Sequence, residues 1–75
     1  MQDLNRYQLA GFSERLNDAI RDSGISKKNL AKKVKISKNT LNNYANGYQV
    51  PNATILAKIC TELKITSDWL LYGKE

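Results

Sequence analysis

The sequence predicts a compact all-α fold in which five short helices surround one modest hydrophobic core. Apolar residues recur along most of the chain at the spacing of helical stripes, and helix-capping and helix-breaking residues interrupt them at short intervals. No stretch of alternating apolar and polar residues is long enough to favour a strand. With 75 residues, of which 41% are hydrophobic and 25% charged, the chain suits a single globular domain.

The first predicted helix lies upstream of Gly24, which supplies its C-terminal stop. Its apolar positions follow the spacing i, i+4, i+7 and i+8: Phe12, Leu16, Ala19 and Ile20. Residues 1–10 are predicted to be either an N-terminal arm or an upstream extension of this helix, and residues 11–73 to be the domain itself.

The second and third predicted helices are joined by a tight turn. Ser26 and Ser37 are the N-caps of these helices, and Gly47 ends the third. Their expected buried positions are Leu30, Ala31 and Val34, followed by Leu41, Tyr44 and Ala45. Two short helices with such a turn between them are the helix-turn-helix arrangement, here Ser26 to Ala45.

Two further helices complete the predicted fold. Pro51-Asn52 marks the start of the fourth, whose apolar stripe is Ile55, Leu56, Ile59, Cys60 and Leu63. Ser67 is expected to cap a last short helix over Asp68 to Tyr72, which Gly73 closes, leaving residues 74–75 as a tail.

The third helix has a polar face made of lysine and asparagine alone. At roughly 100° per residue, Lys38, Asn42, Asn46, Asn39 and Asn43 span an arc of about 140°, opposite the core residues. Asparagine can donate to and accept from adenine N6 and N7, and lysine can donate to guanine O6 and N7. We therefore expect four of these residues to read bases in the major groove of double-stranded DNA: Lys38, Asn39, Asn42 and Asn43.

The positive charge is concentrated in the middle of the chain. None of the seven carboxylates lies between residues 23 and 61, whereas that interval holds seven lysines, and the net charge is +5. Lys27 and Lys28 begin the second helix, where the helix dipole disfavours cations, so a nearby phosphate would account for them. The pattern favours a polyanionic partner; a solvated lysine-rich face is the alternative.

Several function classes are disfavoured. The chain has no histidine and a single cysteine, Cys60, which leaves no internal disulfide and no metal or cofactor site to predict. Asp18 and Asp22 lie one helical turn apart, but Arg15 and Arg21 nearby favour an ion-paired surface over a catalytic pair. We expect no enzyme activity, no small-molecule ligand, no membrane span and an intracellular, cytoplasmic location.

The span from Phe12 to Gly73 resembles the phage Cro/repressor type of helix-turn-helix domain, the XRE family. The pieces that carry the resemblance are Phe12 to Leu16, Leu30 to Val34, Ile36 to Leu41, Tyr44 to Gly47, Pro51 and Asp68 to Gly73. It implies a five-helix, lambda-repressor-like fold that binds operator DNA as a dimer. Its base-reading positions fall on the four residues named above. Together with the dipole argument for Lys28, its backbone positions give Lys27, Lys28, Ser37, Asn46, Tyr48 and Asn52.

Two departures from the family pattern have structural consequences. Lys35 stands where relatives often have glycine, which predicts a strained backbone angle costing about 1 kcal/mol. Ile20 and Ala45 stand where some relatives bury an arginine–glutamate pair. That exchange preserves the fold but removes one constraint on the angle of the recognition helix.

The predicted function is a sequence-specific DNA-binding transcriptional regulator of phage or prophage repressor type, or its N-terminal domain, acting in a bacterial or phage-infected cell. A homodimer would read a symmetric operator; its interface is left open between Trp69 to Tyr72 and the loop near Tyr48. The alternatives are a basic protein-interaction module, an antitoxin-type regulator docking an acidic partner, a membrane-surface binder and an RNA binder.

Overall fold

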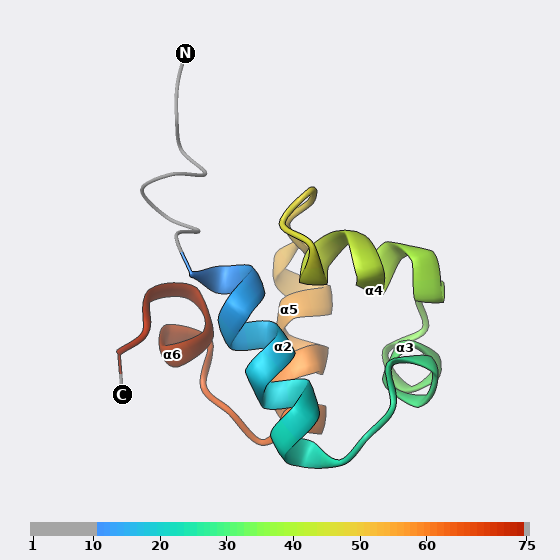
Figure 1. Cartoon of the computed structure of the whole chain (residues 1–75), viewed down its shortest axis with the longest axis horizontal. Coiled ribbons are helices and arrows are strands. Elements are labelled where there is room, and N and C mark those ends of the chain that lie inside the picture. Colours follow the sequence, from blue (N-terminus) through green and yellow to red (C-terminus); the bar gives the residue numbers. More distant parts are fainter. Residues whose placement is uncertain (1–10, 75) are drawn as a thin grey trace.

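The computed structural model describes residues 11–74, which form five helices around one core (Figure 1). The helices are α2 (Phe12–Ser23), α3 (Lys27–Val34), α4 (Lys38–Ala45), α5 (Ala53–Leu63) and α6 (Ser67–Tyr72). No strand occurs within these residues. The all-α, five-helix prediction is confirmed. The arm or extension expected at residues 1–10 lies outside the described residues, as does Glu75 of the expected tail.

The helices are arranged around α2, which packs against α4, α5 and α6. α5 lies behind α2 in Figure 1, α4 crosses above, and α6 and α3 lie on opposite sides. α3 packs against both α4 and α5. One long side of α4 is consequently held by the rest of the domain, and its other side remains open.

The core follows the predicted apolar stripes closely. Its buried hydrophobic residues are Phe12, Leu16, Ala19, Ile20, Leu30, Ala31, Val34, Leu41, Tyr44, Ala45, Ile59, Cys60, Leu63 and Leu70. Ile55 and Leu56 are only partly buried, because they lie at the start of α5 near the edge of the core. Burial raises the pKa of the Cys60 thiol, which therefore packs as a small neutral apolar group.

Side-chain caps set most of the helix starts. The hydroxyl oxygen of Ser26 accepts from the Asn29 N–H, and Asn52 Oδ1 accepts from the Ile55 N–H. The expected Ser67 cap is wrong. Thr66 caps α6, its Oγ1 accepting from the Trp69 N–H at 3.1 Å, so Ser67 is the first helical residue.

Two helices end in a lysine with a left-handed backbone. Lys35 follows α3 with φ 63°, and Lys64 follows α5 with φ 59°. The unfavourable backbone angle predicted at Lys35 is confirmed. Each turn satisfies carbonyls left open at the helix end: the Ile36 N–H donates to Ala31 O and the Ile65 N–H to Cys60 O, both at 3.0 Å.

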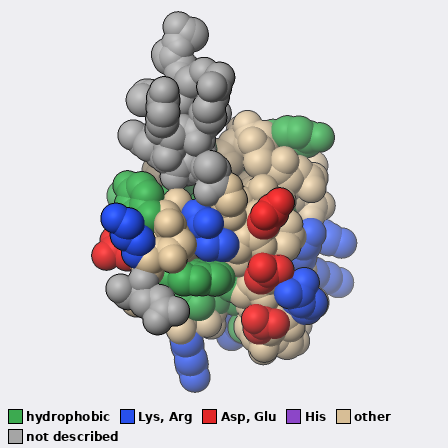
Figure 2. All heavy atoms as spheres, turned by 60° about the vertical axis from the view of Figure 1, so that its left-hand side comes forward, with side chains coloured by type: hydrophobic (Ala, Val, Ile, Leu, Met, Phe, Trp, Pro, Cys, Tyr) green, Lys and Arg blue, Asp and Glu red, His purple; other side chains and the backbone are tan. Residues whose placement is uncertain are grey.

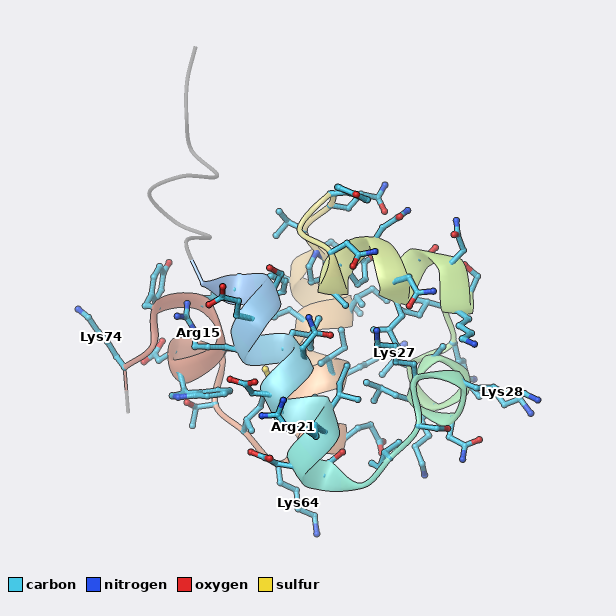
Figure 3. The ribbon with its side chains drawn as sticks, in the orientation of Figure 1. Arg15, Arg21, Lys27, Lys28, Lys64 and Lys74 are labelled. Atoms are coloured by element: carbon cyan, nitrogen blue, oxygen red, sulfur yellow. The ribbon has the colours of Figure 1, made fainter. Side chains whose placement is uncertain are left out.

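Ion pairs and one arginine organise the surface of α2. Arg21 pairs with Asp18 at 2.9 Å and with Asp22 at 3.8 Å, as expected of an exposed, ion-paired face. Figure 2 shows acidic and basic side chains interspersed on the side of the molecule that carries α2 and α6. Arg15 donates from Nε to Leu70 O at 3.0 Å and from Nη2 to Leu71 O at 2.8 Å. These two hydrogen bonds of Arg15 hold α6 against α2 (Figure 3).

No helix within residues 11–74 combines the length and the apolar character that crossing a bilayer requires. The same residues contain no grouping of three or more potential Cys, Asp or Glu metal ligands.

Candidate nucleic-acid interface

The outer side of α4 carries the polar face that the sequence predicts. Ser37 caps the helix, its Oγ accepting from the Thr40 N–H at 2.9 Å. Leu41, Tyr44 and Ala45 point into the core. Opposite them, the four predicted base-reading residues lie on one helix face: Lys38 and Asn39 are exposed, and Asn42 and Asn43 are half-buried. Polar side chains on the outer side of α4 project away from the domain in Figure 3. The structure therefore brings all four predicted residues together.

The amide side chain of Gln49 lies next to the end of this face. Gly47 takes φ 83° and turns the chain back, so that the Tyr48 and Gln49 N–H groups donate to Asn43 O at 2.9 and 3.3 Å. Asn43 Nδ2 donates to Gln49 Oε1 at 3.3 Å. The pair leaves Asn43 with its Oδ1 and one N–H for another partner. Gln49 was not among the residues predicted from the sequence, where its only signal is an amide side chain shortly after the Gly47 turn.

The lysines at the start of α3 point in different directions. Lys27 is half-buried and Lys28 is exposed; Figure 3 shows Lys28 extending away from the domain. Within residues 11–74, no carboxylate lies within ion-pair distance of Lys27, Lys28 or Lys38. Because α3 has no acidic residue in its first turn, this end of the helix combines unpaired cations with open backbone N–H groups.

The predicted phosphate-contacting residues differ in the donors that they retain. Ser37 donates its hydroxyl proton to Thr40 Oγ1 at 2.8 Å, so that proton is used within the helix. Asn52 uses Oδ1 as a cap and keeps its Nδ2 donors. Asn46 is exposed at the end of α4, and Tyr48 is 76% exposed in the loop after that helix. Donors for a phosphate are therefore present on Asn46, Tyr48 and Asn52. The Ser37 hydroxyl could donate to a phosphate only after its hydrogen bond to Thr40 Oγ1 is broken.

Other lysines lie on a separate surface. Lys33, Lys35 and Lys58 line a shallow groove of about 410 Å³ between α3 and α5, where Lys33 Nζ lies 3.9 Å from Glu62 Oε1. α4 does not line this groove. The structure thus divides the lysines into a group at the starts of α3 and α4 and a second group that lines the groove between α3 and α5.

Comparison with known proteins places this geometry in a family. A family model described as "Helix-turn-helix domain" matches residues 13–75. The HTH-type transcriptional regulator ImmR of Bacillus subtilis (strain 168) is 34% identical over 64 residues, covering 85% of this chain and 50% of ImmR. The chain thus spans about half the length of this curated relative.

Solved structures share the fold. The P22 c2 repressor protein, in a crystal structure with the synthetic operator 9T, matches with a TM-score of 0.80 and 24% identity, over 84% of this chain and 96% of that one. The clp gene regulator ClgR from C. glutamicum matches with a TM-score of 0.74 and 20% identity, over 80% of this chain and 77% of its own. The repressor-type fold expected from the sequence is confirmed, and the chain belongs to the helix-turn-helix domain family, of XRE type.

Proposed function

We propose that this chain is the DNA-binding part of a transcriptional repressor that reads a symmetric operator with α4 in the major groove. The observation that carries the proposal is the outer face of α4, which presents only lysine and asparagine and has no carboxylate beside it. Two similar proteins support it: ImmR is a transcriptional regulator, and the P22 c2 repressor is seen with a synthetic operator.

The chemistry of the face suits base edges. Asn39, Asn42 and Asn43 each carry an amide that can donate and accept at once, which matches adenine N6 and N7. Lys38, at the first position of α4, suits guanine O6 and N7. The half-buried Asn42 and Asn43 lose less side-chain freedom on binding than a fully exposed residue would, and they are the stronger candidates for specificity.

Phosphate contacts would flank the base-reading face. Lys27 and Lys28 stand at the N-terminal end of α3, where backbone N–H groups and the helix dipole also favour an anion. Asn46, Tyr48 and Asn52 offer donors at the other end of α4. Such contacts give affinity and orientation but no sequence preference.

A homodimer would place two copies of α4 in successive major grooves, about 34 Å apart. The domain has exposed apolar groups that a second copy could cover at two places. One is α6, with Tyr72 53% exposed; the other is the loop after α4, with Tyr48 76% and Val50 43% exposed. Repression would result when the bound dimer blocks a promoter.

The proposal is tested by selecting duplexes from a random pool and measuring affinities for selected and random DNA by fluorescence anisotropy. Asn42→Ala should weaken binding to the selected site by about 1–3 kcal/mol and leave random DNA unaffected, because only a base contact is lost. Thr61→Ala, exposed on α5, is the control and should change neither affinity. A wild-type protein that binds selected and random duplexes equally would overturn the proposal and favour a general basic surface.

The phosphate contacts are tested by the salt dependence of the same affinities. Lys27→Ala should reduce the slope of log affinity against log salt concentration by about one unit. Lys74→Ala removes the same charge on the opposite side of the domain (Figure 3) and should leave the slope almost unchanged. Equal slopes for the wild type and the Lys27 variant would remove Lys27 from the interface.

A further inference from the structure

We propose that Asn17 of α2 is a positioning residue that sets the angle of α4 against the rest of the domain. The proposal rests on the proposed function of α4 as the base-reading helix. Asn17 Nδ2 donates to Ala45 O, the last carbonyl of α4, at 2.9 Å, and to Ser13 O of α2 at 2.9 Å. Both N–H groups of the amide are therefore used.

These two bonds link the two helices in a fixed direction. The bond to Ser13 holds the amide against its own helix, and the bond to Ala45 extends it to the C-terminal end of α4. Carbonyls at a helix end have no partner within the helix, so Ala45 O needs one from elsewhere. Within residues 11–74, this is the side-chain hydrogen bond that joins α2 to α4.

The packing between the same helices has no comparable directional contact. Ile20 and Ala45 are both buried, and no charged or polar side chain within residues 11–74 is buried beside them. Apolar contact stabilises the packing without fixing rotation, because it depends on buried area rather than direction. A hydrogen bond requires both a distance and an angle, so the Asn17 amide supplies a constraint that methyl groups cannot.

A shift at the end of α4 would reach the base-reading residues. Asn43 lies half a turn before Ala45, and its carbonyl holds the Tyr48 and Gln49 N–H groups. The turn at Gly47 also lies near Ser13, whose Oγ is 3.6 Å from where a β-carbon on Gly47 would stand. The first turns of α2 therefore contact both the end of α4 and the loop that brings Gln49 back to Asn43.

The experiment compares two residues of α2 that each hold a backbone carbonyl. Ser23 Oγ donates to Ile20 O at 2.7 Å, but this acceptor lies in its own helix, so the bond does not join α2 to α4. Asn17→Ala and Asn17→Asp both remove the donor, the second at nearly constant volume, and Asn17→Gln returns an amide. Ser23→Ala is the matched control. The readouts are unfolding stability, the ratio of affinities for selected and random duplexes, and the amide resonances of Asn43 and Gln49 without DNA.

We expect Asn17→Ala and Asn17→Asp to lower the affinity ratio about tenfold, the size of one lost base contact, and to shift both resonances. Asn17→Gln should restore part of the ratio, and Ser23→Ala should lose stability without changing the ratio or the resonances. Unchanged resonances and a ratio within about twofold of wild type in the Asn17 variants would overturn the proposal, since one base contact is worth more than that. If the wild type itself shows no preference, the proposed function fails; the DNA-free resonances then still decide whether Asn17 positions α4.

Discussion

The turn that joins α3 to α4 and the turn that joins α5 to α6 are built from nearly the same residues. One is Val34-Lys35-Ile36-Ser37 and the other is Leu63-Lys64-Ile65-Thr66. Each has a buried last helical residue, a left-handed lysine, a half-buried isoleucine and a hydroxyl cap. Their φ angles differ by 4° (63° against 59°), and each isoleucine N–H donates to the carbonyl five residues before it at 3.0 Å.

The turn after α2 resembles the other two turns, except that two hydrogen bonds through a serine hydroxyl replace the direct backbone bond. Ser23-Gly24-Ile25-Ser26 has glycine at the left-handed position, with φ 76°. Here the Ile25 N–H donates to Ser23 Oγ at 3.0 Å, and Ser23 Oγ donates to Ile20 O at 2.7 Å. The serine hydroxyl thus mediates the link that a direct backbone bond makes in the other two turns.

The helices that begin after the two lysine turns have different surfaces. After Ser37 come Lys38 and Asn39 on an exposed polar face, whereas after Thr66 come Ser67, Asp68 and a partly buried tryptophan. The same turn geometry therefore serves the proposed recognition helix and a helix that packs against α2 and α5. A helix-turn-helix is a general way to join short helices, and the side chains of the second helix determine what it can bind.

The largest effect should come from the leucine that each turn places in the core. Leu41 lies four residues after Ser37 and Leu70 four residues after Thr66, and both are 0% exposed. Leu41→Ala and Leu70→Ala should each lower the free energy of unfolding by about 2–5 kcal/mol, since each leaves a cavity. Urea denaturation measures both. If one costs less than half as much as the other, the two turns are not energetically equivalent.

A smaller effect should separate the functions of α4 and α6. Asp68 lies at the second residue of α6, a favourable place for a carboxylate, and Asn39 occupies the same place in α4. Asn39→Asp should stabilise the fold by about 0.3–1 kcal/mol, because the charge complements the helix dipole. It should also reduce affinity for a selected duplex about tenfold or more, because a carboxylate would replace a base contact.

The matched variant is Asp68→Asn. It should lose a similar amount of stability in thermal unfolding and leave DNA affinity unchanged, because α6 is not part of the proposed interface. A gain of DNA affinity in Asn39→Asp would contradict the assignment of Asn39.

The smallest effect should come from the left-handed lysines themselves. Lys35→Gly and Lys64→Gly should each relieve about 1 kcal/mol of backbone strain. The more flexible unfolded chain offsets about 0.4–1 kcal/mol of this gain. The net stabilisation, at most about 0.5 kcal/mol, should be equal at both sites in thermal unfolding. Stabilisation at one site alone would show that the two turns carry unequal strain.

The sequence predicts the helices and the core well because both depend on local signals. Apolar spacing identifies most buried residues of the first four helices, and Gly24, Ser26, Ser37 and Asn52 mark their ends as the structure has them. The error at Ser67 has a simple cause. Thr66 and Ser67 are adjacent hydroxyl residues that can both cap a helix, and spacing alone does not choose between them.

The contacts of Asn17, Gln49 and Arg15 could not be predicted because their partners depend on how the helices pack. Asn17 reaches a carbonyl 28 residues away, and Gln49 meets Asn43 only because Gly47 reverses the chain. The sequence shows that Ile20 and Ala45 stand where some relatives have a buried charged pair. It does not show that the Asn17 amide donates to Ala45 O. The base-reading and phosphate-contacting assignments remain predictions that the binding experiments test.

The bonds of Arg15 to α6 have a kinetic consequence. They join residues 55 and 56 positions apart, so they form only when the first and last described helices have come together. Contacts with such large sequence separation tend to form late in folding, because the loop between them must close first. Interactions absent from the transition state affect the unfolding rate far more than the folding rate. We therefore expect this guanidinium to determine how long each folded molecule persists, and to have little influence on how quickly it folds.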